Sequence, residues 1–227
     1  MRVIVSIGGS VLAPDLEADR VEAHADTIDK LRADGHEIAA VVGGGGVARQ
    51  YIESARELGA TEYDLDALGI DVTRLNARLL ITSLDHSAAP EPAKSHEDAR
   101  ASLRRGEIAV MGGTTPGHTT DAVAALLAEM VSADLLVYAT SVPGVFSADP
   151  NESDEAERYD RLTASELVDV IASIETAAGS NAPVDLLAAK IIERSGLRTV
   201  VLDGTEPSRI AAAVAGDADG TEVVSDG

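Results

Sequence analysis

The sequence contains no cysteine, and this absence excludes disulfides, zinc–thiolate sites and thiol nucleophiles. Aromatic side chains are also scarce, with one Phe, four Tyr and no Trp among 227 residues. So few rings cannot form a stacking platform for single-stranded nucleic acid. No apolar run approaches the ~20 residues of a membrane span, and the chain enters a predicted strand directly rather than through a signal peptide. We therefore expect a cytoplasmic protein that binds neither nucleic acid nor membrane.

Basic residues are few as well: 18 Lys and Arg stand against 39 Asp and Glu, for a formal net charge of −21. Only three of the basic residues are lysines, namely Lys30, Lys94 and Lys190. Such a surface repels nucleic acid and, over long range, anionic small molecules. In ~1 M salt, however, the Debye length falls to ~3 Å, which screens this repulsion. The composition therefore favours a halophilic protein, adapted to concentrated salt such as that of haloarchaeal cytoplasm.

Apolar runs alternate with segments of helical periodicity along the chain. The strands expected from the apolar runs lie at residues 2–9, 37–42, 107–111, 133–140, 197–204 and 221–224. The main helices are expected at residues 15–35, 47–59, 67–84, 120–130, 163–174 and 185–196. This alternation predicts a three-layer αβα (α/β) fold around a mostly parallel sheet of about eight strands. No repeat or linker divides the chain, so a single domain over residues 1–227 is expected.

Glycine-rich loops follow three of the predicted strands. The first contains Gly9 and Ser10, the second consists of Gly43 to Gly46, and the third begins at Gly112. Ligands of a parallel sheet bind at the carboxyl ends of its strands, and glycines let backbone N–H groups approach a phosphate. Taken alone, the first loop is equally well explained as an ordinary strand-to-helix turn. The first two loops lack both the Walker A pattern and a complete dinucleotide fingerprint.

Residues 112–130 carry the richest set of ligand-binding groups. Thr114, Thr115, Thr119 and Thr120 supply hydroxyl groups, and the helix that follows directs the positive end of its dipole toward them. A tight turn with an N-cap threonine is the alternative explanation. Together the three loops predict a site large enough for more than one phosphate group.

Charged residues near these loops can serve either a ligand or the local fold. Arg49 lies in the first turn of a helix, where a cation opposes the dipole unless an anion lies between them; a solvated helix-face arginine is the alternative. Asp66 either caps the helix that it opens or accepts hydrogen bonds from two sugar hydroxyls. Asp121 either complements the helix dipole or orients donors and binds Mg²⁺ through water. A turn explains Asp149, and a helix cap explains Asp185.

Taken together, these segments resemble the amino acid kinase family, and within it the archaeal uridylate (UMP) kinases. The resemblance covers nearly the whole chain. It is carried by IGGSVL, VVGGG with Arg49, TRLNARLL after Asp66, VMGGTTPGHTTDAVAALLAE, ADLL with Thr140, VPGVFSADP and DLLAAKII. The resemblance implies an enzyme that transfers the γ-phosphate of ATP to UMP in pyrimidine nucleotide biosynthesis, giving UDP and ADP, with Mg²⁺ and as a homohexamer.

The resemblance also implies a role for each matching residue. The N-terminal half (about 1–132) would bind the acceptor and the C-terminal half (about 133–227) the ATP. The implied ATP-binding residues are Gly9, Ser10, Gly45, Arg49, Thr140, Phe146 and Asp149. The implied UMP-binding residues are Gly44, Asp66, Thr114, Thr115, Pro116, Gly117, His118, Thr119 and Thr120. The residues that match catalytic positions are Arg49, Asp121 and Asp185. No dedicated metal-ligand cluster is implied.

Three positions depart from the pattern. Ser6 stands where many relatives carry a lysine, although archaeal members generally lack it too. Phe146 stands where Tyr is more usual and Ser141 replaces an Asn, so a changed affinity for adenine is expected. The rival functions are another small-molecule kinase of the same fold, acting on isopentenyl phosphate or acetylglutamate, and a nucleotide sensor without turnover. Isopentenyl phosphate kinases place a histidine in the second glycine loop, which is absent here.

Overall fold

The structure of the chain is a computed structural model that describes residues 1–85, 87–148, 150, 153, 155–176 and 182–226. Its strands are β1 (Arg2–Ile7), β2 (Glu37–Val42), β3 (Ala109–Met111), β4 (Leu135–Thr140), β5 (Arg161–Thr163), β6 (Thr199–Asp203) and β7 (Gly220–Val224). Its helices are α1 (Gly9–Leu12), α2 (Ala18–Ala33), α3 (Gly45–Glu57), α4 (Glu62–Ser83), α5 (His96–Arg104), α6 (Thr120–Val131), α7 (Ala164–Thr176), α8 (Leu186–Ser195) and α9 (Ser208–Ala215).

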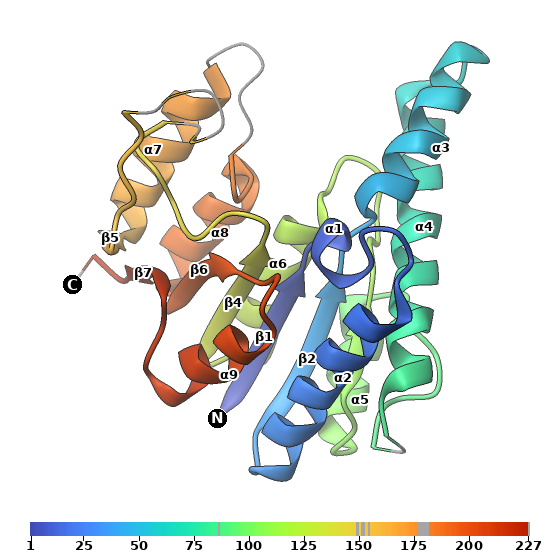
Figure 1. Cartoon of the computed structure of the whole chain (residues 1–227), viewed down its shortest axis with the longest axis horizontal. Coiled ribbons are helices and arrows are strands. Elements are labelled where there is room, and N and C mark those ends of the chain that lie inside the picture. The colour runs from blue at the N-terminus through green and yellow to red at the C-terminus, as the bar shows by residue number, and fades with distance from the viewer. Residues whose placement is uncertain (86, 149, 151–152, 154, 177–181, 227) are drawn as a thin grey trace.

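The strands form one mostly parallel sheet with helices against both faces (Figure 1). Within the described residues it has 7 strands in the order β3-β2-β1-β4-β6-β7-β5, against the roughly eight expected. Neighbouring strands from β3 to β6 pair in parallel, β7 runs antiparallel to β6, and β5 pairs in parallel with β7. The predicted three-layer α/β fold is confirmed. The short elements α1, β5 and α9 were not predicted from the sequence.

The central strand β1 shows how the sheet separates two hydrophobic cores. Val3, Val5 and Ile7 face a core that includes side chains of α1, α2, α4 and α9. Ile4 faces the opposite core, which includes side chains of α5, α6, α7 and α8. Successive side chains of a strand alternate between the two faces. Ser6 therefore lies on the α6 side, where its hydroxyl can meet residues of that helix.

Helix α4 begins earlier than the sequence predicted. Thr61 and Asp64 form a capping box: the Thr61 hydroxyl accepts a hydrogen bond from the Asp64 N–H, and the Asp64 carboxylate accepts one from the Thr61 N–H. This pattern satisfies two N–H groups at a helix start. The predicted helix start at Asp66 is therefore wrong, and the alternative explanation of Asp66 as the helix cap is excluded. The correction leaves the Asp66 carboxylate free of any cap role.

The starts of α6 and α8 agree with the sequence. Thr119 caps α6 and accepts a hydrogen bond from the Ala122 N–H at 3.1 Å. Asp185 caps α8 and accepts one from the Ala188 N–H at 2.9 Å. Within the described part of the chain, no helix has both the length and the apolar character of a membrane span.

Candidate functional site

Three adjoining cavities line the carboxyl edge of the parallel strands. The β4-side cavity, of about 500 Å³, lies among the loop after β4, the end of α7 and the approach to α8. The central cavity, of about 250 Å³, is bordered by the first two glycine loops. The α4-side cavity, of about 410 Å³, lies between α3, α4 and the loop before α6. Because Arg49 lines all three, they form one continuous cleft.

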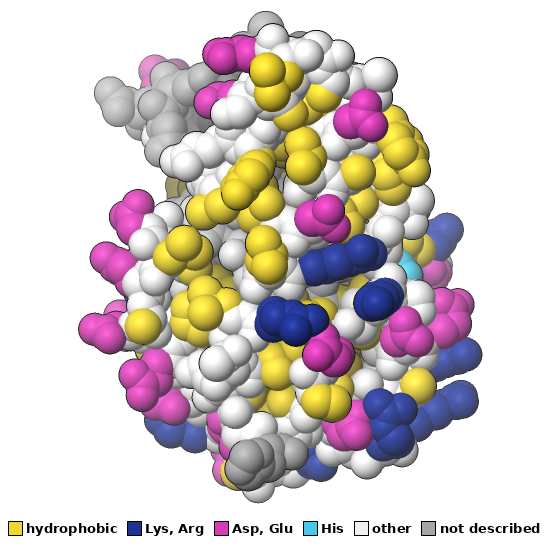
Figure 2. All heavy atoms as spheres, turned by 90° about the vertical axis from the view of Figure 1, so that its right-hand side faces the viewer, with side chains coloured by type: hydrophobic (Ala, Val, Ile, Leu, Met, Phe, Trp, Pro, Cys, Tyr) yellow, Lys and Arg dark blue, Asp and Glu magenta, His cyan; other side chains and the backbone are white. Residues whose placement is uncertain are grey.

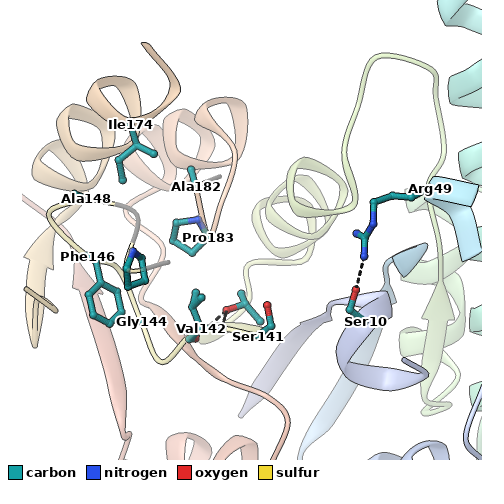
Figure 3. A pocket seen from close by; sticks show the side chains of 12 residues that line it. Ser10, Arg49, Ser141, Val142, Gly144, Phe146, Ala148, Ile174, Ala182 and Pro183 are labelled. Carbon is teal, nitrogen blue, oxygen red and sulfur yellow. Dashed lines mark hydrogen bonds between the residues drawn. The ribbon is translucent and has the colours of Figure 1, made fainter. Parts of the chain in front are cut away.

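The β4-side cavity has a polar end and an apolar end (Figure 3). Ser10 and Arg49 lie together at the polar end, where the Arg49 guanidinium donates to the Ser10 hydroxyl at 3.2 Å. Phe146, Pro183 and Ile174 lie across the cavity at the apolar end. This arrangement suits a ligand with an anionic part and a flat apolar part.

Four of the residues that resemblance assigned to ATP line this cavity, namely Ser10, Arg49, Thr140 and Phe146. Asp149 lies outside the described residues. The lining also includes residues not predicted from the sequence, which are Val142, Gly144, Ala148, Pro150, Ile174, Ala182 and Pro183. Most of these are small or apolar, and only their place in the fold marks them as part of a site.

The loop that carries Phe146 is held by hydrogen bonds at both ends. The Thr140 hydroxyl accepts from the Val142 N–H at 3.1 Å, and the Thr221 hydroxyl accepts from the Val145 N–H at 2.8 Å. Gly144 has φ +145°, and a Cβ there would lie 2.6 Å from the Thr221 hydroxyl. Only glycine tolerates both conditions. The position of Phe146 in the cavity therefore depends on contacts with β4 and β7.

The central cavity depends on close packing of the first two glycine loops. A Cβ on Gly9 would lie 2.5 Å from the Gly43 carbonyl oxygen, and one on Gly43 would lie 2.7 Å from the Gly9 nitrogen. Gly45, at the start of α3, has a φ of +63°. The glycines are thus required by backbone contact, and they bring the N-termini of α1 and α3 to one place. The predicted residues Gly9, Ser10, Gly44, Gly45 and Arg49 all line this cavity, and their contacts with a nucleotide stay predictions.

Asp121 lines the central cavity, and the charge of Asp185 acts on it from nearby. The Ser6 hydroxyl donates to the Asp121 carboxylate at 3.3 Å. Burial and the nearby charge of Asp185 raise the pKa of Asp121 from 3.8 to about 7, against the lowering effect of the Ser6 hydrogen bond. The Thr119 hydroxyl donates to Asp185, which links the caps of α6 and α8. The predicted catalytic residues Asp121 and Asp185, 64 positions apart in the sequence, thus meet in the fold.

This carboxylate pair fits a magnesium ion that arrives with a nucleotide. Among the described residues, no group of three or more His, Asp or Glu side chains is arranged to hold a metal ion. Mg²⁺ commonly needs only one or two carboxylates, because phosphates and waters complete its shell. A cation beside Asp121 and Asp185 would also favour the charged form of Asp121, against the burial and the Asp185 charge that raise its pKa.

The α4-side cavity contains most of the residues assigned to UMP. The predicted residues that line it are Gly44, Asp66, Gly117, His118, Thr119 and Thr120. The Asp66 carboxylate accepts a hydrogen bond from the Gly117 N–H at 2.7 Å, and Gly117 has φ +84°. Asp66 therefore holds the tip of the threonine loop against α4. Thr114, Thr115 and Pro116 belong to the same loop but do not line the cavity, so their contact with UMP stays a prediction.

Part of this cavity was not predicted from the sequence. Gly45 and Arg49, which were assigned to ATP, and Gly113 of the third glycine loop also line it. The lining residues that no prediction included are Ala48, Ile52, Gly69, Ile70 and Thr73. Those on α3 and α4 fit an amphipathic pattern and would be assigned to a helix–helix contact. Gly69 is the available signal, because a glycine inside a helix costs about 1 kcal/mol relative to alanine.

Residues 1–203 match the amino acid kinase family. The chain belongs to the amino acid kinase family. Among relatives in this family, it is 83% identical to the uridylate kinase of Natronomonas pharaonis over 99% of each chain. It is 68% identical to the uridylate kinase of Halobacterium salinarum over 100% of this chain and 95% of that one. The crystal structure of uridylate kinase from Archaeoglobus fulgidus matches with a TM-score of 0.90 and 48% identity, over 99% of this chain and 100% of that chain.

Proposed function

We propose that this amino acid kinase family member is a UMP kinase, which transfers the γ-phosphoryl group of ATP to UMP and gives UDP and ADP. The observation that carries the proposal is the 83% identity to a uridylate kinase over 99% of both chains. The continuous cleft supports it, because phosphoryl transfer between two nucleotides needs two ligand pockets that meet at one phosphate-binding centre.

The β4-side cavity is the proposed ATP site and the α4-side cavity the proposed UMP site. The apolar end near Phe146 would take the adenine, and the Ser10 and Arg49 end the phosphates. At the other end of the cleft, the Asp66 carboxylate has oxygen lone pairs beyond the one that Gly117 uses, and these suit ribose hydroxyls. In this assignment the C-terminal half holds the adenine end of ATP, and the N-terminal half holds UMP and, through Ser10 and Arg49, the ATP phosphates.

Catalysis would rest on positioning and electrostatics. A phosphate oxygen of UMP attacks in line, and this acceptor is already ionised, so no general base is needed. Arg49 and the N–H groups at the starts of α1 and α3 stabilise the negative charge of the phosphoryl group in transfer. Asp121 and Asp185 are the residues that would hold Mg²⁺ through water, and the ion supplies further charge neutralisation when bound.

The homohexamer implied by the resemblance is also proposed, with one surface as its support. Tyr51, Leu58, Tyr63, Leu75 and Leu79 are exposed along α3 and α4, and we call this surface the α3–α4 face. Figure 2 shows apolar side chains there, mixed with Lys, Arg, Asp and Glu. Both charge signs line a groove that also contains Leu75. A surface with both signs and apolar side chains can pair with a second copy of itself, in spite of a net charge of −21.

The acidic surface supports the sequence-based prediction that the protein functions in the cytoplasm of a salt-adapted cell. The chain has 39 acidic and 18 basic residues, and the two most similar relatives named above belong to haloarchaea. High salt would screen the repulsion between an anionic protein and its anionic nucleotides. We therefore propose that the enzyme needs concentrated salt both for folding and for substrate binding.

The function is tested by a coupled assay of ADP release in concentrated KCl. UMP, CMP, dUMP and isopentenyl phosphate are supplied in parallel as acceptors, with ATP and Mg²⁺. We expect turnover with UMP to exceed that with isopentenyl phosphate by at least about 1000-fold in kcat/KM, because isopentenyl phosphate lacks the ribose hydroxyls proposed to donate to the Asp66 carboxylate. Absence of UMP-dependent ADP release would overturn the kinase proposal and favour a nucleotide sensor.

A further inference from the structure

Helix α4 contacts the second and the third glycine loops of the site at once. Two polar side chains make these contacts: Thr73 is 7% exposed and Asn76 is 4% exposed. They lie three residues apart, so they project from the same face of the helix. Neither of them was predicted to belong to the site, and both are buried between α4 and the glycine loops.

The amide of Asn76 binds the second glycine loop. Its nitrogen donates to the Gly43 carbonyl at 2.9 Å and to the Gly44 carbonyl at 3.2 Å. The Gly43 N–H in turn donates to the Ile7 carbonyl at the end of β1, at 2.9 Å. Two successive carbonyls of the loop are thus directed toward α4 rather than into the central cavity, and both hydrogens of the amide are used.

The direction of these carbonyls decides what the cavity offers to a phosphate. Gly44 and Gly45 stand at the start of α3, where the first N–H groups of a helix have no partner inside it. Those N–H groups are the anion-binding groups of a helix start. If either peptide turned over, a carbonyl oxygen would face the phosphate and repel it. Asn76 therefore holds the loop in the orientation that phosphoryl transfer requires.

The hydroxyl of Thr73 binds the third glycine loop. It donates to the Ile70 carbonyl inside α4 at 2.6 Å and accepts from the Gly113 N–H at 2.7 Å. Because its hydrogen is committed to Ile70, a lone pair faces Gly113. A Cβ on Gly112 would lie 2.7 Å from the Thr73 carbonyl carbon, so glycine alone permits this approach. Thr73 thus fixes the start of the third glycine loop at Gly113, and Asp66 holds the same loop farther along, at Gly117.

We propose that Asn76 and Thr73 are positioning residues. Through them, α4 sets the spacing between the second glycine loop, Gly43 to Gly46, and the third glycine loop, which begins at Gly112. The inference rests on the proposed function, since it assigns Gly43 to Gly45 to the transferring phosphate and Gly113 to the UMP side. It predicts that the two residues affect different kinetic parameters. Asn76 acts on kcat, because its loop borders the central cavity. Thr73 acts on the KM for UMP, because its loop borders the α4-side cavity.

The test compares variants of similar size in steady-state kinetics, in concentrated KCl and well below the Tm of each protein. Asn76→Leu removes both donors and should lower kcat about 100-fold, the loss typical of a ~1 Å misplacement. The KM values for ATP and UMP should stay within about threefold. Asn76→Ala serves as a second variant where Leu does not accumulate as folded protein.

Thr73→Val and Thr73→Ser form the matched pair for the second loop. Valine keeps the shape but lacks the hydroxyl, so the KM for UMP should rise about fivefold to tenfold while the KM for ATP is unchanged. Serine keeps the hydroxyl and should restore the KM for UMP. A purely structural role would lower Tm in all these variants without this pattern.

The outcomes are distinguishable from a failure of the proposed function. Wild-type values of kcat in Asn76→Leu and Asn76→Ala, together with wild-type KM in Thr73→Val, would overturn the inference even if Tm falls. Wild-type protein that uses another phosphate acceptor in place of UMP would overturn the UMP assignment. The kcat effect at position 76 and the acceptor KM effect at position 73 would then be measured with that acceptor, and their absence would overturn the inference in turn.

Discussion

Replacing Asp121 by Asn should stabilise the nucleotide-free protein at alkaline pH, although the residue is proposed to serve catalysis. Burial, and then the charge of Asp185, raise the pKa of this carboxyl from 3.8 to about 7. The folded state therefore binds the proton more tightly than the unfolded state does. The free energy of unfolding of the wild type falls as the pH rises from 3.8 to about 7, and it stays low above that pH.

The size of the effect follows from the shift. About three pKa units at 1.36 kcal/mol each correspond to about 4 kcal/mol. As a residue, Asp121 is only half-buried and lines the open central cavity, so solvent screening reduces this figure to about 2 kcal/mol. For a protein of this length, 1 kcal/mol changes Tm by about 2–4 °C, so the variant should melt about 4–8 °C above the wild type at pH 8. The Asn oxygen still accepts the Ser6 hydrogen bond, so the Ser6 hydroxyl keeps its acceptor.

The assay is thermal unfolding, followed by circular dichroism in constant KCl without nucleotide, from about pH 4 to about pH 8.5. The difference in Tm between Asp121→Asn and wild type should be smallest near pH 4 and reach its maximum above pH 7. Other carboxylates titrate in both proteins and cancel in this difference. Asp169→Asn, on the exposed surface of α7, removes the same formal charge and serves as the control. A difference that does not change with pH, or an equal change in the control, would refute the reasoning.

The remaining predictions concern substrates, assembly and salt. Asp66→Asn should raise the KM for UMP about fivefold to tenfold in steady-state kinetics with little change in kcat, because the amide can still accept from Gly117 but has lost its charge; an unchanged KM would limit Asp66 to holding the loop. Arg49→Ala should lower kcat about 100-fold in the same assay while Tm stays nearly constant, since the side chain is exposed, and a wild-type kcat would contradict its role. Leu75→Glu should yield a smaller particle by light scattering after gel filtration in KCl; an unchanged mass would exclude this part of the α3–α4 face from the interface. Tm should climb as KCl rises from about 0.1 to about 2 M, and a protein equally stable at both concentrations would not be halophilic.

Local patterns in the sequence were sufficient to predict the layers of the fold and the positions of the three glycine loops. A short run rich in β-branched residues, such as Val3–Ile7, is typical of a strand buried inside a sheet, and a Gly cluster directly after a strand lies at its carboxyl end. A threonine cap before α6 and the Asp185 cap before α8 were recognised as alternatives for the same reason, since a cap depends on the next three residues alone. The structure identifies the threonine as Thr119 and shows Asp185 in the cap role.

Local patterns failed where two signals of similar strength competed. Asp66 and Thr61 both precede an apolar helical segment, and the capping box of Thr61 with Asp64 determines where α4 begins. The short β5 has too few residues for a period, and its pairing with β7 comes from contacts across the sheet edge. Thr73 and Asn76 fit the buried face of a helix, so nothing in their spacing distinguished packing from positioning.

The sequence by itself determined the fold class, the phosphate-binding loops and, through its resemblance to a family, the expected ligands, because each of these depends on residues that are neighbours along the chain. Only the tertiary structure decided which groups act together. It placed Asp185 beside Asp121, turned the Asn76 amide toward the Gly43 and Gly44 carbonyls, and put Arg49 at the junction of three cavities. Burial, the pKa of a carboxyl and the direction of a peptide depend on what packs around a residue, and that is a property of the assembled layers.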